Sequence, residues 1–118
     1  MKIDILTFEA GMVAVTVDDE DIIGPFAVHA TLPPGLDDPP CFCITHIPSG
    51  KVIVPFQNWV WWHKEGALEF ARELAAVWDD ADAEQDADGN WRGTQTGAEK
   101  FRAVRRKLGY LEKKRREG

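Results

Sequence analysis

The sequence contains few of the residues that cross-link, anchor or export a protein. Its 118 residues include two cysteines, Cys41 and Cys43, which are too few for a disulfide scaffold. No apolar run approaches the ~18 residues that span a bilayer, and no basic-then-apolar leader opens the chain. These absences predict a reduced, cytoplasmic protein without a membrane partner.

Catalytic motifs are equally scarce. Ser49 is the sole serine, and it falls in a predicted hairpin turn rather than in the strand–turn–helix setting of a nucleophile elbow. Neither of the common glycine-rich loops that cradle phosphates occurs. The sequence therefore favours a protein without a catalytic set or a cofactor, although two carboxylates that meet only in the folded chain would still permit an enzyme.

One cluster has the residue types of a metal site. Cys41, Cys43 and His46 lie close together in the sequence, but on a strand the two cysteines point to one face and His46 to the other. His29, from the preceding strand, could complete a three-ligand set with both thiols. Zinc needs four ligands, or three and a water, and the fourth is not visible. We therefore expect small, partly buried cysteines and no metal.

A second segment resembles the start of a calcium-binding loop. Residues 84–90 alternate oxygen-bearing side chains and place Gly89 at the sixth position. The first position is Glu84 rather than aspartate, and the twelfth is Gln95 rather than a bidentate glutamate. Because that glutamate supplies much of the affinity, we expect Asp88 and Gly89 to form an ordinary turn.

Charge is abundant and unevenly distributed. Hydrophobic residues make up 44% and charged residues 29% of the sequence, which is typical of one folded globular domain. Residues 1–98 contain five basic and seventeen acidic residues (net −12), whereas residues 99–118 contain nine and three (net +6). We assign residues 1–111 to a single domain and residues 112–118 to a basic C-terminal tail.

The first half of the chain predicts strands. Five β-rich segments are separated by turn signals, at residues 3–8, 11–17, 25–32, 41–47 and 51–56. Pro48, Ser49 and Gly50 join the last two segments as a hairpin. Four prolines within residues 33–40 exclude regular structure there, because each removes a backbone donor and fixes φ.

Alternation within these segments assigns their faces. Phe26 and Val28 are expected to point inward, and Ala27 and His29 outward. Strands precede helices along the chain, which is the order of an α+β fold. We therefore predict a four- or five-stranded, mostly antiparallel sheet, covered on one face by two C-terminal helices.

Two amphipathic segments supply the helices. Over residues 64–78 apolar residues fall in adjacent pairs with a period of about 3.6, which gives a wide apolar stripe. The second helix is predicted to have Thr96 as its N-cap, with Glu99 three positions on completing a capping box. Gly109 is expected to end or weaken this helix.

A tryptophan-rich segment is the first candidate for a binding site. Trp59, Trp61 and Trp62 lie within four positions, and His63 follows. Neither a strand nor a helix can point three neighbouring indoles into one core, so at least one is expected at the surface. Because tryptophan is enriched at interface hot spots, we interpret these four residues as a protein-binding patch. The alternative is two core indoles and a third that covers the sheet edge.

A cationic stripe on the second helix is the other candidate. Four basic residues share one sector of the helical wheel, opposite its apolar side: Arg102, Arg105, Arg106 and Lys113. Such a stripe can follow phosphates or an acidic partner, so nucleic-acid binding through these residues is the alternative function. The stripe could equally be solvated or lie on the protein's own acidic surface.

The hairpin run Ile44–Lys51 is followed by the helical run Gly66–Ala75. This pattern, over about a third of the chain, is similar to small uncharacterised proteins of bacteriophages and prophages. The resemblance implies a small accessory protein that binds a host enzyme and alters it, and it transfers no catalytic residue. We therefore expect a non-enzymatic protein-binding module, a phage-type inhibitor or regulator of host transcription or nucleic-acid defence machinery, acting in the host cytoplasm.

Overall fold

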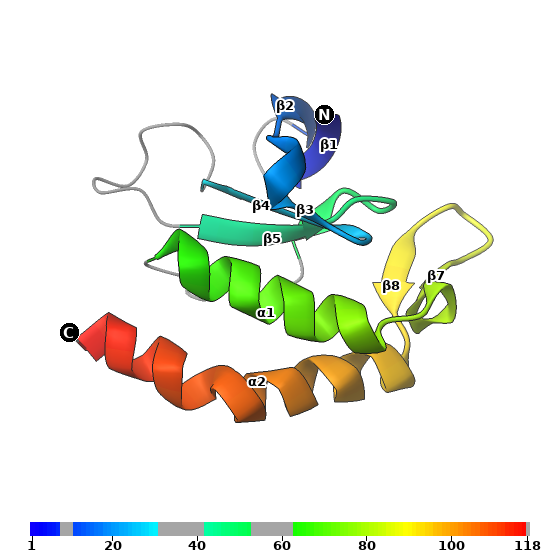
Figure 1. Ribbon diagram of the computed structural model, residues 1–118. Helices are drawn as coiled ribbons and strands as arrows, with labels where there is room; N and C mark the ends of the chain where they lie inside the picture. The colour runs from blue at the N-terminus through cyan, green and yellow to red at the C-terminus, as the bar shows by residue number, and fades with distance from the viewer. Residues whose placement is uncertain (8–10, 31–41, 53–62, 118) are drawn as a thin grey trace.

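The computed structural model describes residues 1–7, 11–30, 42–52 and 63–117 (Figure 1). Its elements, in chain order, are β1 (Lys2–Thr7), β2 (Gly11–Thr16), the 3-10 turn η1 (Asp19–Asp21), β3 (Ile22–Ile23), β4 (Phe26–Ala30), β5 (Phe42–His46), β6 (Lys51–Val52), α1 (Lys64–Val77), the 3-10 turn η2 (Asp80–Asp82), β7 (Ala83–Gln85), β8 (Trp91–Gly93) and α2 (Gln95–Glu117). Within these residues neither helix is both long and apolar enough to cross a membrane.

A four-stranded antiparallel sheet in the order β3-β4-β5-β6 lies at the centre of the fold. β4 and β5 make its longest pairing, in which Val28 lies opposite Ile44 and His29 opposite Cys43. The predicted hairpin between β5 and β6 is confirmed, as is the α+β architecture with an antiparallel sheet and two helices.

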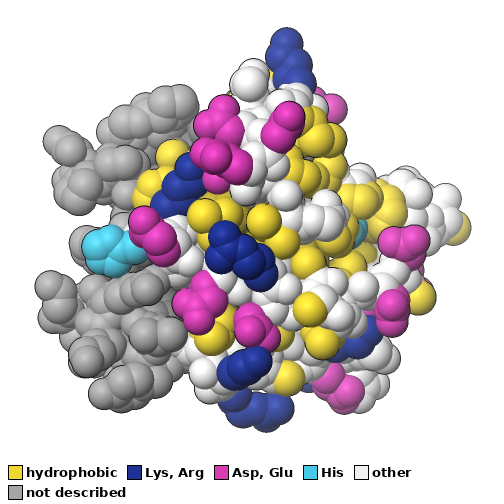
Figure 2. All heavy atoms as spheres, viewed as in Figure 1, with side chains coloured by type: hydrophobic (Ala, Val, Ile, Leu, Met, Phe, Trp, Pro, Cys, Tyr) yellow, Lys and Arg dark blue, Asp and Glu magenta, His cyan; other side chains and the backbone are white. Residues whose placement is uncertain are grey.

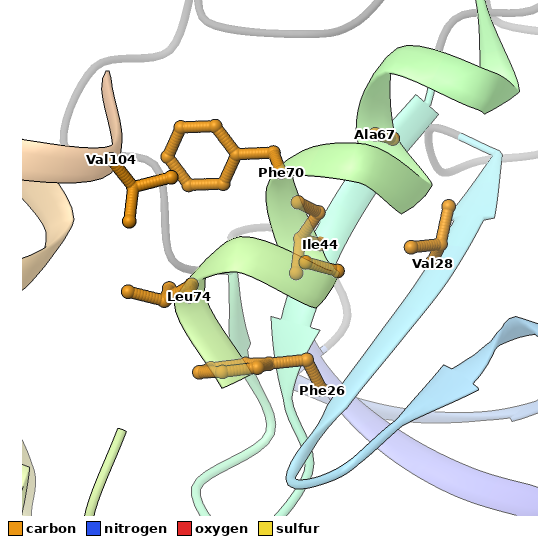
Figure 3. Close-up of a cluster of buried hydrophobic side chains, with 8 residues drawn as sticks. Phe26, Val28, Ile44, Ala67, Phe70, Leu74 and Val104 are labelled. Atoms are coloured by element: carbon orange, nitrogen blue, oxygen red, sulfur yellow. The ribbon is translucent and has the colours of Figure 1, made fainter. Parts of the chain in front are cut away.

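α1 covers one face of this sheet. Phe26, Val28 and Ile44 project from β4 and β5 toward the helix, and all three side chains are buried. α1 meets them with the wide apolar stripe that the sequence predicts, and its buried members are Ala67, Phe70, Ala71 and Leu74 (Figure 3). Full burial of each large side chain contributes roughly 1.5–3 kcal/mol, so this contact is a major source of stability.

α2 forms a further layer, on the side of α1 away from the sheet (Figure 1). Val104 packs into the same core as Phe70, and the rings of Phe70 and Phe101 lie 5.2 Å apart between centroids. Lys107 adds an ion pair to α1, with its Nζ 2.8 Å from Glu73 Oε2. Both helices therefore lie on one side of the sheet, as predicted, with α1 between the sheet and α2.

The expectation that Ala27 and His29 point outward, away from any core, is wrong, because both residues are buried. The β1–β2 ribbon packs on the face opposite α1, where Ile3, Ile5 and Ala27 belong to a second buried cluster. His29, expected to point into solvent, is 9% exposed. Alternation could not reveal this second layer, because an alanine beside polar residues is compatible with either environment.

Close backbone contacts at Gly50 join the ribbon to the β5–β6 hairpin. The Leu6 N–H donates to the Gly50 carbonyl over 2.7 Å. A Cβ on Gly50 would lie 2.8 Å from the Asp4 carbonyl oxygen and 2.9 Å from Met12 Cε, and the φ of Gly50 is +71°. Glycine is therefore required here both for its conformation and for the space it leaves.

The acidic connection between the helices contains a small hairpin made by β7 and β8. Trp91 of β8 packs against His46 of β5, with ring centroids 5.8 Å apart. Lys51 Nζ also donates to the Trp91 carbonyl over 2.6 Å. These contacts tie the hairpin to the central sheet next to the start of α2.

The predicted N-cap of α2 is wrong, and of the two outcomes expected for Gly109, an end or a weakening of the helix, the structure contradicts the first. The helix starts at Gln95, and its N-cap is Thr94, whose hydroxyl accepts the Gly97 N–H over 3.1 Å. Thr96 lies within the first turn, so it forms no capping box with Glu99. Gly109 does not end the helix, which continues through residues 112–117; an internal glycine costs only about 1 kcal/mol relative to alanine.

The backbone of α2 lies close against η2 at Gly97. A Cβ at this position would collide with the carbonyl group of Asp82, whose oxygen accepts the Thr94 N–H. We expect Gly97→Ala to lower the free energy of unfolding by roughly 1–3 kcal/mol, the usual cost of overpacking. Gly93→Ala is the matched control, because nothing lies within 4 Å of its Cβ position. Urea unfolding compares the two variants, and equal stabilities would contradict this seating of α2.

Candidate functional site

The outward side of α2 carries exposed basic side chains. Because α2 turns its apolar residues toward α1, the opposite sector of the helix faces solvent. Arg102 and Arg106 lie there one turn apart and are exposed, and Arg105 is half-buried. Lys113 belongs to the same helix, but its side chain is outside the described ones. We call Arg102, Arg105, Arg106 and Lys113 the basic face of α2.

The neighbouring lysines of α2 are neutralised by ion pairs. Lys100 Nζ lies 2.6 Å from Asp82 Oδ2 and 3.2 Å from Asp79 Oδ2, and Lys107 pairs with Glu73. Arg102 and Arg106, in contrast, make no ion pair with any residue that the structure describes. Their charges therefore remain available to a partner.

The pair between Lys100 and Asp82 fixes the position of α2. Burial opposes ionisation of Asp82, but the hydrogen bonds from Lys100 and from the Asp79 N–H outweigh it and lower the pKa of the Asp82 carboxyl. The hydrogen bond to Asp82 in turn raises the pKa of Lys100. Both groups are charged near neutral pH, so they hold the first turns of α2 against η2 and orient the basic face.

Basic and acidic side chains both occur across the face shown in Figure 2. Some of the Lys and Arg side chains lie along the lower edge of the view, over α2, and a group of Asp and Glu side chains lies toward the top, near η1. Asp18, Asp19 and Glu20 are exposed in that upper segment. The protein carries a net charge of −6, so the basic face is a local positive surface on an acidic molecule.

The tryptophan-rich segment that holds Trp59, Trp61 and Trp62 lies outside the described residues. His63 is described: it is exposed and precedes α1, with extended backbone (φ −123°, ψ 136°). The other two tryptophans, Trp78 and Trp91, pack against the ring of His46. Those two indoles serve the fold, and a protein-binding patch at residues 59–63 stays a prediction.

Sequence reasoning missed a buried pair formed by His46 and Ser49. His46 Nδ1 and Ser49 Oγ lie 2.8 Å apart, and Ser49 Oγ also accepts the Lys51 N–H over 3.1 Å. Both residues are 7% exposed. The hydroxyl thus closes the hairpin turn and presents no accessible nucleophile. Its spacing of three residues from a histidine across a turn is the signal that could have predicted the contact.

The structure brings two of the candidate metal ligands together, and the ring nitrogens of one of them are already hydrogen-bonded. Cys43 and His29 lie opposite each other on β5 and β4. The two ring nitrogens of His29 lie 2.7 Å from the Ala30 carbonyl oxygen and 2.7 Å from the Thr45 hydroxyl. Cys41 is outside the described residues. Among the residues with described positions, no group of three His, Cys, Asp or Glu side chains could hold a metal ion.

The calcium-like segment closes on itself as a turn. Asp86 Oδ1 accepts the N–H of Asp88 over 2.9 Å and that of Asn90 over 3.0 Å, and Gly89 has a φ of +86°. The bonds from Asn90 and Asp88, with the charge of Arg92, lower the pKa of Asp86 despite an opposing effect of desolvation. The expected turn at Asp88 and Gly89 is confirmed.

Two buried histidines make stability depend on pH. Burial lowers the pKa of His29 against an opposing hydrogen bond to Ala30, and it lowers the pKa of His46 against the charge of Asp80. The unfolded chain therefore binds protons more readily, so stability is fully present above about pH 6.5 and declines as the pH falls below it.

Urea unfolding at about pH 8 and about pH 5.5 measures this decline, in a window set by the ordinary histidine pKa. We expect His29→Asn, whose side-chain amide can still donate to the Ala30 carbonyl, to lose less stability between the two pH values than the parent protein. A parent protein that is equally stable at both would contradict the burial of neutral histidines.

Comparison with known proteins leaves the function open. The chain matches no protein-family model, and neither the curated proteins nor the solved structures give a significant match. A functional assignment must therefore rest on the geometry of the chain itself.

Proposed function

We propose that the protein is a non-enzymatic protein-binding module that docks an acidic surface of its partner on the basic face of α2. The observation that carries this proposal is the pair Arg102 and Arg106, which are exposed, one helical turn apart and without an ion pair among the described residues. In this proposal the partner is a host enzyme that the module inhibits or regulates, which is the role implied by its resemblance to small bacteriophage proteins.

The firm attachment of α2 supports a docking role. The helix is held near its start by the Lys100–Asp82 pair, in the middle by Val104, and further along by Lys107 and Glu73. A surface that is already ordered loses little conformational freedom on binding. Arginine also suits acidic partners, because its planar guanidinium can bond a carboxylate with two parallel N–H groups.

The charge of the rest of the chain favours a protein over a nucleic acid. Residues 1–98 carry a net charge of −12, and Glu99 is exposed on α2 itself. An extended polyanion that approached α2 would also meet these acidic side chains, whereas the acidic patch of a protein can be limited to the basic face.

Nucleic-acid binding is the second candidate, and the straight line of the basic face favours it. Arg102 and Lys113 are eleven positions apart on one helix, which is roughly 16 Å along the axis. A helix with basic residues in a line can follow a phosphate backbone. The two candidates differ in their response to nuclease and to salt.

Charge reversal on the basic face tests the proposal. The immobilised full chain and its Arg102→Glu/Arg106→Glu variant are each incubated with nuclease-treated host lysate, and the retained proteins are identified by mass spectrometry. We expect the parent to retain a specific enzyme and the variant to bind it at least about tenfold more weakly, because two like-charge contacts replace two attractive ones.

Two controls show whether the effect belongs to this surface. Arg72→Glu changes an exposed arginine of α1 and should retain the enzyme, and Arg102→Lys/Arg106→Lys keeps the charge and should retain most of the binding. Equal capture by the parent and the charge-reversed variant would contradict the proposal. Loss of capture on nuclease treatment, with steeply salt-dependent binding of DNA or RNA, would favour the second candidate instead.

A further inference from the structure

β2 forms an edge at which the second buried cluster is incompletely covered. Ile3 and Ile5 of β1 are 4% and 1% exposed, whereas the residues opposite them on β2, Val15 and Val13, are half-buried. In the part of the chain that the structure describes, β2 pairs with β1 alone. The cluster therefore ends at β2 with inward-facing apolar side chains still in contact with water.

β2 lacks the features that normally protect an edge strand. Its sequence, Gly-Met-Val-Ala-Val-Thr, contains no charged residue and no proline. On the face of β2 that points away from the second cluster, Met12 is 56% exposed, and Leu6, which lies opposite it on β1, is 43% exposed. Edge strands of native sheets usually carry charges, prolines or bulges that stop another strand from pairing with them. An unprotected edge of this kind can accept a further strand.

We propose that β2 pairs antiparallel with β2 of a second copy of the chain, about a two-fold axis at Ala14. Side chains alternate along a strand, so inward residues must meet inward residues across the new pair. An axis at Ala14 satisfies this rule, because it places Val13 opposite the partner's Val15 and Met12 opposite the partner's Thr16. The two ribbons then form one four-stranded sheet that covers the half-buried valines of both copies.

The acidic residues around β2 favour this orientation. Asp18, Asp19 and Glu20 follow β2 directly and are exposed. Antiparallel pairing places the two acidic segments at opposite ends of the joined strands, roughly 30 Å apart at about 3.3 Å per residue. That distance is well beyond the ~8 Å over which charges act at physiological salt. Parallel pairing would place the two segments side by side.

The contact between the two β2 strands is small. A pair of six-residue strands buries much less than the roughly 800 Å² per partner of a stable interface, so the dimer is expected to be weak and concentration-dependent. β2 and α2 lie on opposite sides of the molecule (Figure 1), so the dimer leaves both basic faces exposed. This inference is independent of the proposed function.

Opposite charges placed on the proposed two-fold axis give a specific test. Ala14 is exposed, and the axis brings it next to the partner's Ala14. Ala14→Lys alone and Ala14→Glu alone place like charges side by side, so each variant should remain monomeric. A mixture of the two brings opposite charges together and should restore association. Ala76→Lys, the same substitution at an exposed position of α1, is the matched control.

Sedimentation equilibrium over a wide concentration range measures the mass of each sample, and thermal unfolding checks that each variant is folded. For the parent and for Ala76→Lys, we expect the measured mass to rise with protein concentration, from the chain mass of 13.3 kDa toward twice that value. A parent that stays at the chain mass overturns the proposal. The proposal is also overturned if Ala14→Lys and Ala14→Glu each still associate alone, or if their mixture fails to associate. Ala14→Thr adds no charge and should associate as the parent does.

Discussion

The packing of α1 between the central sheet and α2 is the contact on which the other features depend. α1 meets Phe26 and Ile44 of the sheet on one side, and its Phe70 also meets Phe101 of α2. A helix that has to contact two layers needs a wide apolar stripe, and α1 has one. Because the apolar side of α2 packs against α1, its basic side faces solvent. The orientation of the candidate binding surface is thus a consequence of core packing.

Local patterns in the sequence were sufficient to predict the elements that contribute most to this core. The β5–β6 hairpin, the apolar stripe of α1 and the exposure of Arg102 and Arg106 each follow from spacing within one segment. Features that depend on distant contacts could not be predicted in this way. Thr94 rather than Thr96 caps α2 because the Asp82 carbonyl, twelve positions upstream, bonds to the Thr94 N–H and hydroxyl.

The burial of the second sheet face shows the same limitation. The sequence of β4 itself does not show that Ala27 will be covered, since Ala27 packs against residues of β1 and against Val17, which follows β2 near the start of the chain. The Ser49–His46 bond likewise depends on how the hairpin turn folds. For the candidate site, sequence identified the basic residues, but the ion pairs that neutralise Lys100 and Lys107 required the folded arrangement of η2, α1 and α2.

Two surfaces remain for interactions after the fold is assembled, and they differ in chemistry. The basic face of α2 attracts anionic groups at long range and is sensitive to salt. The edge of β2 is uncharged and acts only at contact, through backbone hydrogen bonds and apolar side chains. Since they lie on opposite sides of the molecule, one can be occupied without blocking the other.

The central claim is that one side of α2 is buried against α1 and that its basic side is exposed to solvent. The reactivity of single cysteines introduced on α2 tests this claim most directly. Ala103 is exposed and Val104 is 6% exposed, so these adjacent positions sample the solvent side and the core side of α2. After subtraction of the parent's own thiols, we predict that Ala103→Cys reacts rapidly and Val104→Cys reacts only on unfolding. Ala103→Cys should also favour an anionic thiol reagent over a neutral one, relative to Ala76→Cys on α1. Equal reactivity at 103 and 104, or no preference for the anionic reagent, would contradict the account.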